Sequence, residues 1–236
     1  LFPYTTLFRS YSLIHQQVDA IVLVPIDSKA LVQPVVEAVR KGVPVINIDI
    51  RLDTQLLEQA GVEVAFVGPD NFAAAYEVGK LLDKKLRNED KVAIIEGLAA
   101  ADNAQQRKRG FIKAIEEKGL RLVASEPADW ETEKAAEVFQ AMWMRYPDLK
   151  AVYCSNDAMA LGVLQQMQEK NCYLPVVGFD NDAVMKEFLS TGKLVATADI
   201  FSSQMAVRGI EFALDVLEGK IENRGVHSTA YEIIKQ

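Results

Sequence analysis

The sequence predicts an α/β fold built on parallel, doubly wound sheets, and three observations support this prediction. Short apolar runs rich in β-branched residues alternate with longer segments whose apolar residues follow helical spacing. The apolar runs are continuous rather than alternating, which is typical of strands that helices cover on both faces. Strand and helix alternate along the whole chain, and this order favours parallel sheets.

The expected elements follow one another in a regular order. Residues 20–24 (AIVLV) form the first expected strand, which ends at Pro25. The next expected helix, at 28–41, has apolar residues at helical spacing, with Asp27 or Ser28 as a suitable N-cap. The other expected strands are short apolar runs at 44–48, 62–67, 92–95, 120–125, 151–154, 175–179, 194–198 and 231–234. The other expected helices are 11–17, 71–86, 104–118, 131–146, 158–169, 182–190 and 203–217.

Length and charge narrow the class of protein. The chain has 236 residues, enough for one large domain or two small lobes with real cores. A net charge of −7 gives no broad basic surface for phosphates, so we expect no nucleic-acid partner. No run of about 18 apolar residues occurs, so no membrane span is expected.

The two cysteines are interpreted as free thiols. Cys154 should lie at the carboxyl end of one parallel strand, and Cys172 just before the start of the next. These positions are at opposite edges of a sheet, too far apart for a disulfide. Their number therefore leaves the redox compartment open.

The sequence predicts a binding protein rather than an enzyme. His15 and His227 lie far apart in the pattern and are interpreted as surface residues. No Cys–His or Ser–His pair, metal cluster, P-loop or dinucleotide fingerprint is present, so no cofactor or metal is expected. Asp49 and Asp180 could serve acid–base chemistry, but hydroxyl binding explains them with fewer assumptions.

Polar residues gather directly after the expected strands, where open parallel sheets bind ligands. Carboxylates, amides and arginines can pair with the hydroxyls of a sugar, and an aromatic ring can cover its C–H face. The set comprises Asp27, Asp49, Arg51, Asp70, Asn71, Asp102, Asn103, Arg107, Asp129, Trp130, Asn156, Asp157, Asp180, Asn181 and Asp199.

Helix capping is the competing interpretation of these residues. Asp and Asn are favoured N-caps, and for any one of them capping is the more frequent role. Arg107 is different, because a cation near a helix start is disfavoured and needs a compensating partner. Trp130 suits either a ligand platform or the core. Three residues are assigned to capping: Asn71, Asp157 and Asp182.

Residues 1–10 (LFPYTTLFRS) do not fit the pattern that follows. This segment matches the in-frame translation of a widely used sequencing adapter. We therefore expect it to be a non-native assembly scar and exclude it from fold reasoning.

Several motifs together resemble the ribose- and galactose-type periplasmic sugar-binding proteins. The resemblance extends from residue 11 to 236, and it is specific because the motifs occur in order. They are VDAIVLVPIDSKAL at 18–31, GVPVINID at 42–49, VGPDN at 67–71, NAQQRKRGF at 103–111, ADWE at 128–131, NDAMALG at 156–162, VVGFD at 176–180 and GKLVAT at 192–197.

The resemblance implies a type I periplasmic-binding-protein fold. In that family two Rossmann-like lobes are joined by a hinge of three crossovers, expected here near 68–70, 199–202 and 228–231. It implies an N-terminal lobe of 11–69 plus 201–228, lacking its first βα unit, and a C-terminal lobe of 70–200 plus 229–236. Sugar would bind between the lobes, which close around it.

The resemblance also implies the ligand-binding residues. Asp49, Arg107, Asn156 and Asp180 match hydroxyl- and ring-oxygen-binding residues, and Trp130 stands where the family has a stacking aromatic. Arg51 and Asp199 are also expected to bind the ligand. Each lies next to a position, Ile50 or Ile200, where this chain departs from the family pattern.

Those departures bear on which sugar is bound. Ile50 replaces the arginine that follows the carboxylate in ribose binders, and Arg51, one step later, should point to the opposite side of a strand. Ile200 replaces a hinge glutamine, and Trp130 replaces Phe. Another pentose or a hexose is therefore as plausible as ribose.

The implied function is the substrate-binding component of a sugar ABC transporter. Its partners would be a monosaccharide, a permease and in some systems a chemoreceptor, with the protein itself monomeric. Its location would be the periplasm, or lipid-anchored outside the membrane in a Gram-positive host, with the signal peptide in the absent upstream part. The alternative is the effector-binding domain of a lactose-repressor-family regulator, which shares the fold.

Overall fold

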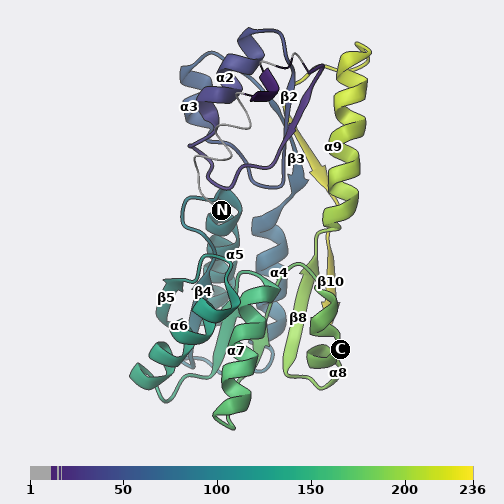
Figure 1. Ribbon diagram of the computed structural model, residues 1–236. Coiled ribbons are helices and arrows are strands. Elements are labelled where there is room, and N and C mark those ends of the chain that lie inside the picture. Colours follow the sequence, from purple (N-terminus) through teal and green to yellow (C-terminus); the bar gives the residue numbers. More distant parts are fainter. Residues whose placement is uncertain (1–11, 15, 17, 236) are drawn as a thin grey trace. The chain divides into compact units, whose positions relative to one another are not determined.

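The computed structural model describes residues 12–14, 16 and 18–235 and divides into two compact units (Figure 1). The expected scar at 1–10 and His15 lie outside the described residues. Unit 1 comprises Leu1–Pro69, Ala100–Asn103 and Phe201–Ala230, and unit 2 comprises Asp70–Ala99, Ala104–Ile200 and Tyr231–Gln236. These units differ from the expected lobes at two places. Residues 100–103 and 229–230 were expected in the C-terminal lobe, and they belong to unit 1.

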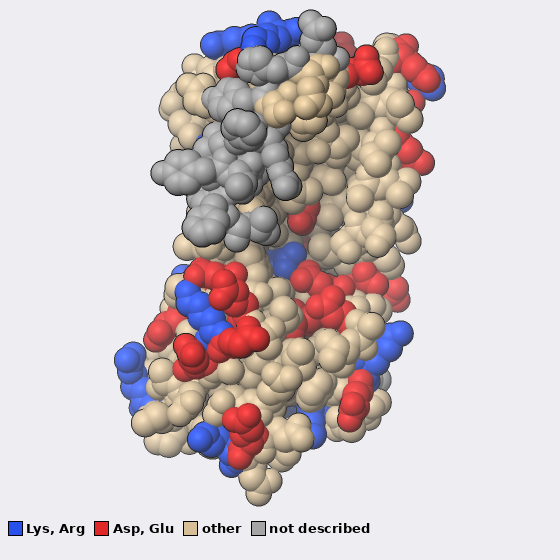
Figure 2. Space-filling view, viewed as in Figure 1, with Lys and Arg blue, Asp and Glu red and all other residues tan. Residues whose placement is uncertain are grey.

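Charged side chains of both signs are interspersed over the face shown in Figure 2. This distribution agrees with the counts of 26 basic and 33 acidic residues. Among the described residues, none of the helices has the length and apolar character needed to cross a bilayer.

Unit 1 is a four-stranded sheet covered by helices. The strand order is β1-β2-β3-β9, and each neighbouring pair is parallel. The strands are β1 (Ile21–Leu23), β2 (Val45–Ile48), β3 (Ala65–Pro69) and β9 (Val226–Thr229). The helices are α2 (Val32–Arg40), α3 (Thr54–Gln59) and α9 (Ser202–Leu217).

Successive residues of β2 show that unit 1 has a core on each face of its sheet. Val45 belongs to a cluster with residues of α2, whereas Ile46 and Ile48 pack with Ala213 of α9. Because side chains alternate along a strand, α2 and α9 cover opposite faces. Burial on both faces explains the continuous apolar run PVINI in the sequence.

Unit 2 is a six-stranded mixed sheet. Its order is β10-β8-β7-β6-β4-β5, parallel except for β10, which pairs antiparallel with β8 at the edge. The strands are β4 (Lys91–Glu96), β5 (Arg121–Pro127), β6 (Ala151–Cys154), β7 (Val176–Val177), β8 (Leu194–Asp199) and β10 (Glu232–Lys235). The helices are α4 (Asn71–Asp83), α5 (Asp102–Lys118), α6 (Thr132–Arg145), α7 (Asp157–Glu169), η1 (Ala183–Met185) and α8 (Lys186–Ser190).

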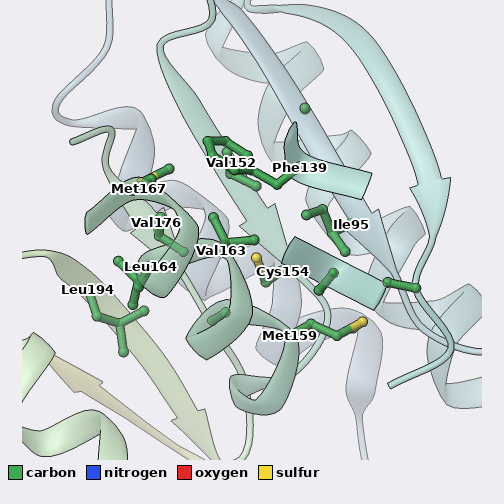
Figure 3. Close-up of a cluster of buried hydrophobic side chains, with 14 of the residues drawn as sticks. Ile95, Phe139, Val152, Cys154, Met159, Val163, Leu164, Met167, Val176 and Leu194 are labelled. Carbon is green, nitrogen blue, oxygen red and sulfur yellow. The ribbon is translucent and has the colours of Figure 1, made fainter. Parts of the chain in front are cut away.

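Different helices cover the two faces of the unit 2 sheet. Val152 and Cys154 of β6 belong to the cluster that includes Phe139 of α6 and Val163 of α7 (Figure 3). Tyr153, between them in the chain, packs its ring 5.4 Å from that of Phe111 on α5. The helices α6 and α7 therefore cover one face, and α5 covers the other.

The structure differs from the expected elements at several points. The polar strand β9 and the short helix α3 were not expected, and the expected helix at 182–190 is a 3₁₀ turn followed by α8. The expected caps of the second helix are wrong, since α2 starts after Leu31. Asp27 instead accepts hydrogen bonds from the N–H groups of Lys29 and Ala30 in the preceding turn.

Candidate functional site

The guanidinium of Arg107 is the centre of a buried polar cluster in unit 2. Its side chain is 3% exposed. Nε donates to Asn71 Oδ1 at 2.9 Å, and Nη1 donates to the carbonyl of Ser155 at 2.8 Å and to Asp180 Oδ1 at 3.3 Å. A buried cation requires such partners, because its desolvation is otherwise very costly. The compensating partner expected from the sequence is therefore present, although Arg107 lies in the second turn of α5 rather than the first.

Two aromatic rings lie near this guanidinium. Its central carbon is 3.7 Å from the ring centroid of Phe179 and 5.5 Å from that of Trp130. Trp130 is half-buried and packs against the core of unit 2, which fits the core role that the sequence allowed, while its use as a ligand platform stays a prediction. Gly97 makes room for it, since a Cβ there would lie 2.1 Å from the indole ring.

The carboxylate of Asp180 is presented by an unusual turn. Asp180 and Asn181 both have positive φ, 109° and 59°, which non-glycine residues rarely adopt. The backbone N–H of Asp180 donates to Ala198 at 2.7 Å, and Asn181 Nδ2 donates to Asp199 Oδ2 at 2.9 Å. The Asp180 side chain is 30% exposed, so it reaches solvent while its neighbours fix its position.

Two of the capping assignments are wrong. The N-cap of α4 is Asp70, which accepts from Ala73 N, and Asn71 bonds Arg107 instead. The N-cap of α7 is Asn156, whose Oδ1 accepts from Met159 N at 2.9 Å, so this expected ligand residue also has a structural role. Asp157 is fully buried and bonds elsewhere.

Asp182 precedes η1 at its N-cap position but makes no side-chain cap hydrogen bond. Its backbone N–H is instead bound by a buried carboxylate. Asp182 therefore occupies the expected N-cap position, but its side chain does not cap the helix.

The expected residues of unit 1 lie directly after β2. Asp49 has φ 65°, so the strand geometry assumed for Arg51 does not continue past Ile48. The Arg51 guanidinium carbon lies 5.6 Å from the Phe66 ring centroid, and its buried Nε has no hydrogen-bond partner among the residues that the structure describes. Arg51 also lines a surface pocket of ≈ 180 Å³.

The structure thus brings together Arg107, Trp130 and Asp180, and joins Asp199 to them through Asn181. Sequence reasoning assigned Asn71 to helix capping and missed Phe179. Phe179 stands inside the VVGFD motif, where it is indistinguishable from an ordinary core residue of a buried strand. The described residues contain no group of three or more potential metal ligands.

Both cysteines are free, as expected, with Cys154 buried and Cys172 partly exposed. Burial raises the pKa of the Cys154 thiol well above its usual range, which makes it unreactive. His227 is exposed and lies 3.0 Å from the carbonyl of Arg224, consistent with a surface histidine.

The profile of the periplasmic binding protein domain matches residues 11–221. The chain belongs to this family. The resemblance deduced from its motifs and the type I periplasmic-binding fold are therefore confirmed, and the family is one of binding proteins rather than enzymes.

Two similar proteins are named for the sugars that they bind. This periplasmic binding protein is 43% identical to the D-ribose/D-allose-binding protein of Pseudomonas aeruginosa, over 92% of the chain and 70% of that relative. It is 35% identical to the D-allose-binding periplasmic protein of Escherichia coli, over 83% of the chain and 64% of that relative.

Solved structures agree with this assignment. A solute-binding protein of an ABC transporter from Burkholderia multivorans has a TM-score of 0.94 and 39% identity, over 99% of this chain and 83% of that one. Another, from Actinobacillus succinogenes with bound D-allose, has a TM-score of 0.92 and 30% identity, over 99% and 84%.

Proposed function

We propose that this chain is the sugar-binding component of an ABC transporter, that it binds a monosaccharide, and that it catalyses no reaction. The observation that carries the proposal is the buried Arg107, hydrogen-bonded to Asp180 and flanked by Trp130 and Phe179. The relatives named for D-ribose and D-allose support a pentose or a hexose as ligand.

The chemistry of the cluster suits a neutral polyol. The half-exposed carboxylate of Asp180 accepts hydrogen bonds from hydroxyls, and the guanidinium donates to ring or anomeric oxygens. The indole face of Trp130 covers the C–H side of the ring. A polyol needs several such contacts, because each buried hydroxyl without a partner is costly.

The other ligand residues expected from the sequence are part of the same proposal. Asn156 keeps its amide N–H groups for a ligand while its oxygen caps α7, and Asp199 holds Asn181 beside the site. Asp49 and Arg51 are proposed as contacts from unit 1. We also propose that its protein partners are a permease and, in some systems, a chemoreceptor. The protein acts outside the cytoplasm as a monomer.

The first test is a thermal-shift screen of pentoses, hexoses and polyols, led by D-ribose and D-allose. A ligand that binds only the folded state raises the melting temperature by mass action. We expect one or two sugars to do so, with dissociation constants near micromolar, about −8 kcal/mol. No shift with any sugar, but a shift with phosphorylated sugars, would favour the effector domain of a regulator instead.

The second test replaces the proposed contacts. Trp130→Ala and Asp180→Ala should each lose at least ~2 kcal/mol of binding free energy, measured by isothermal titration calorimetry. Met144→Ala, at a position that is 76% exposed on α6, is the matched control and should bind as the unchanged protein does. Unchanged affinity in both site variants would refute the assignment.

A further inference from the structure

Asp157 is a fully buried acid whose two oxygens are both engaged. Oδ1 accepts from the Thr197 hydroxyl and Oδ2 accepts from the backbone N–H of Asp182, each at 2.9 Å. Its pKa is raised to about 7, mainly by burial; the two hydrogen bonds oppose this rise, and the nearby Asp180 and Asp182 carboxylates add to it. Burying an acid is costly unless its oxygens are hydrogen-bonded, as both are here.

Thr197 extends the same set of contacts. It is also fully buried, and its Oγ1 accepts from the backbone N–H of Asn181 at 3.2 Å. The backbone N–H of Asp157 donates to the carbonyl of Phe179 at 2.7 Å. The side chains of Asp157 and Thr197 therefore hold the N–H groups of Asp182 and Asn181, and the backbone N–H of Asp157 holds the carbonyl of Phe179.

This turn needs such support. Asp180 and Asn181 occupy positive-φ conformations that persist only where the surroundings fix them. Gly178 is closely fitted to the carboxylate, since a Cβ there would lie 2.0 Å from Asp157 Oδ1. This conformation of the turn places Asp180 Oδ1 where it accepts a hydrogen bond from Arg107 Nη1 at 3.3 Å.

We propose that Asp157 and Thr197 are positioning residues that hold the 179–182 turn so that Asp180 is preset for the sugar. Neither contacts the ligand. The effect on affinity rests on the proposed sugar-binding function, whereas the effect on the turn does not.

The test compares Thr197→Val with Thr197→Ser in the complete 236-residue chain. Valine matches the shape of threonine but leaves Asp157 Oδ1 and the Asn181 N–H without partners, whereas serine keeps the hydroxyl. Hydrogen exchange of the Asn181 and Asp182 amides, measured without ligand, should be at least about tenfold faster in Thr197→Val. The dissociation constant for the sugar found in the screen should rise about tenfold.

Asp157→Asn is the second variant, because an amide can accept only at its oxygen. It should also speed exchange at Asn181 or Asp182. Val163→Ala, in the α7 core shown in Figure 3, is the control for general destabilisation. It should lower the melting temperature while leaving the exchange of this turn and the affinity unchanged.

The proposal would be overturned by unchanged exchange and affinity in Thr197→Val, or by the same effects in Val163→Ala. Loss of function in Thr197→Ser equal to that in Thr197→Val would also contradict it. If the unchanged protein binds no sugar, the proposed function fails, and the exchange of Asn181 and Asp182 still decides whether the two residues hold the turn.

Discussion

Arg107 joins several elements of unit 2 and is also part of the proposed sugar site. It donates to the Ser155 carbonyl, to Asn71 and to Asp180, so it ties α4, α5 and the strand ends of one sheet together. Arg107→Met removes these donors while keeping much of the volume, and it takes a charge-assisted hydrogen bond from the carbonyl of Ser155, a buried residue. We expect the free energy of unfolding to fall by about 2–4 kcal/mol, measured by urea denaturation.

Arg107→Lys is the natural comparison for that variant. Lysine keeps the charge but lacks the planar fork that reaches three partners. It should recover part of the stability and little of the sugar affinity. A Met variant as stable as the unchanged protein would mean that the cluster contributes nothing to folding.

At individual positions the sequence predicted residue chemistry better than residue role. It placed Arg107, Trp130 and Asp180 in one site because each follows a strand. It exchanged the roles within the pairs Asp70–Asn71 and Asn156–Asp157, because both members of each pair are good caps and only one faces the helix start. Which member turns inward depends on tertiary partners such as Arg107 and Thr197, and these are distant in sequence.

At the scale of elements, the buried strands and long helices were predictable and the exposed ones were not. Strand β6 (Ala151–Cys154) was expected with the same bounds, because all four residues are buried. Strand β9 was missed because VHST is polar and three of its four residues are exposed. Helix α3 was missed because only Leu57 of its six residues is buried.

The contact between α6 and α7 gives a prediction of its own. Gly162 of α7 packs so closely that a Cβ would lie 2.0 Å from the carbonyl oxygen of Thr132. Gly162→Ala should therefore lower the free energy of unfolding by about 2 kcal/mol, although alanine is the better helix former. Gln165→Ala, on the exposed side of the same helix, should change it by no more than about 0.5 kcal/mol. An alanine variant at 162 that gains stability would show that the helices can separate without cost.

For the molecule as a whole, the alternation of strands and helices predicted the sheet class but not the division into units. Each unit is assembled from segments far apart in sequence, so no linker or change in composition marks the boundaries. The boundaries were expected only through the family resemblance. The antiparallel strand β10 illustrates the same limit, because a strand's direction depends on where the chain returns and not on its own residues.

The free energy of unfolding should depend on pH through the titration of Asp157. Burial raises its pKa from 3.8 to about 7, so between these values the folded state holds a proton that the unfolded chain has released. This contribution is therefore fully present below the lower value and is lost as pH rises through the upper one. From pH 5 to pH 8 the free energy of unfolding should fall by about 2.5 kcal/mol at most relative to Asp157→Asn, whose amide does not titrate. Urea denaturation of both proteins across this range measures the difference, in which the other carboxylates cancel. A difference that stays constant with pH would mean that Asp157 is ionised throughout, with its two hydrogen bonds outweighing its burial.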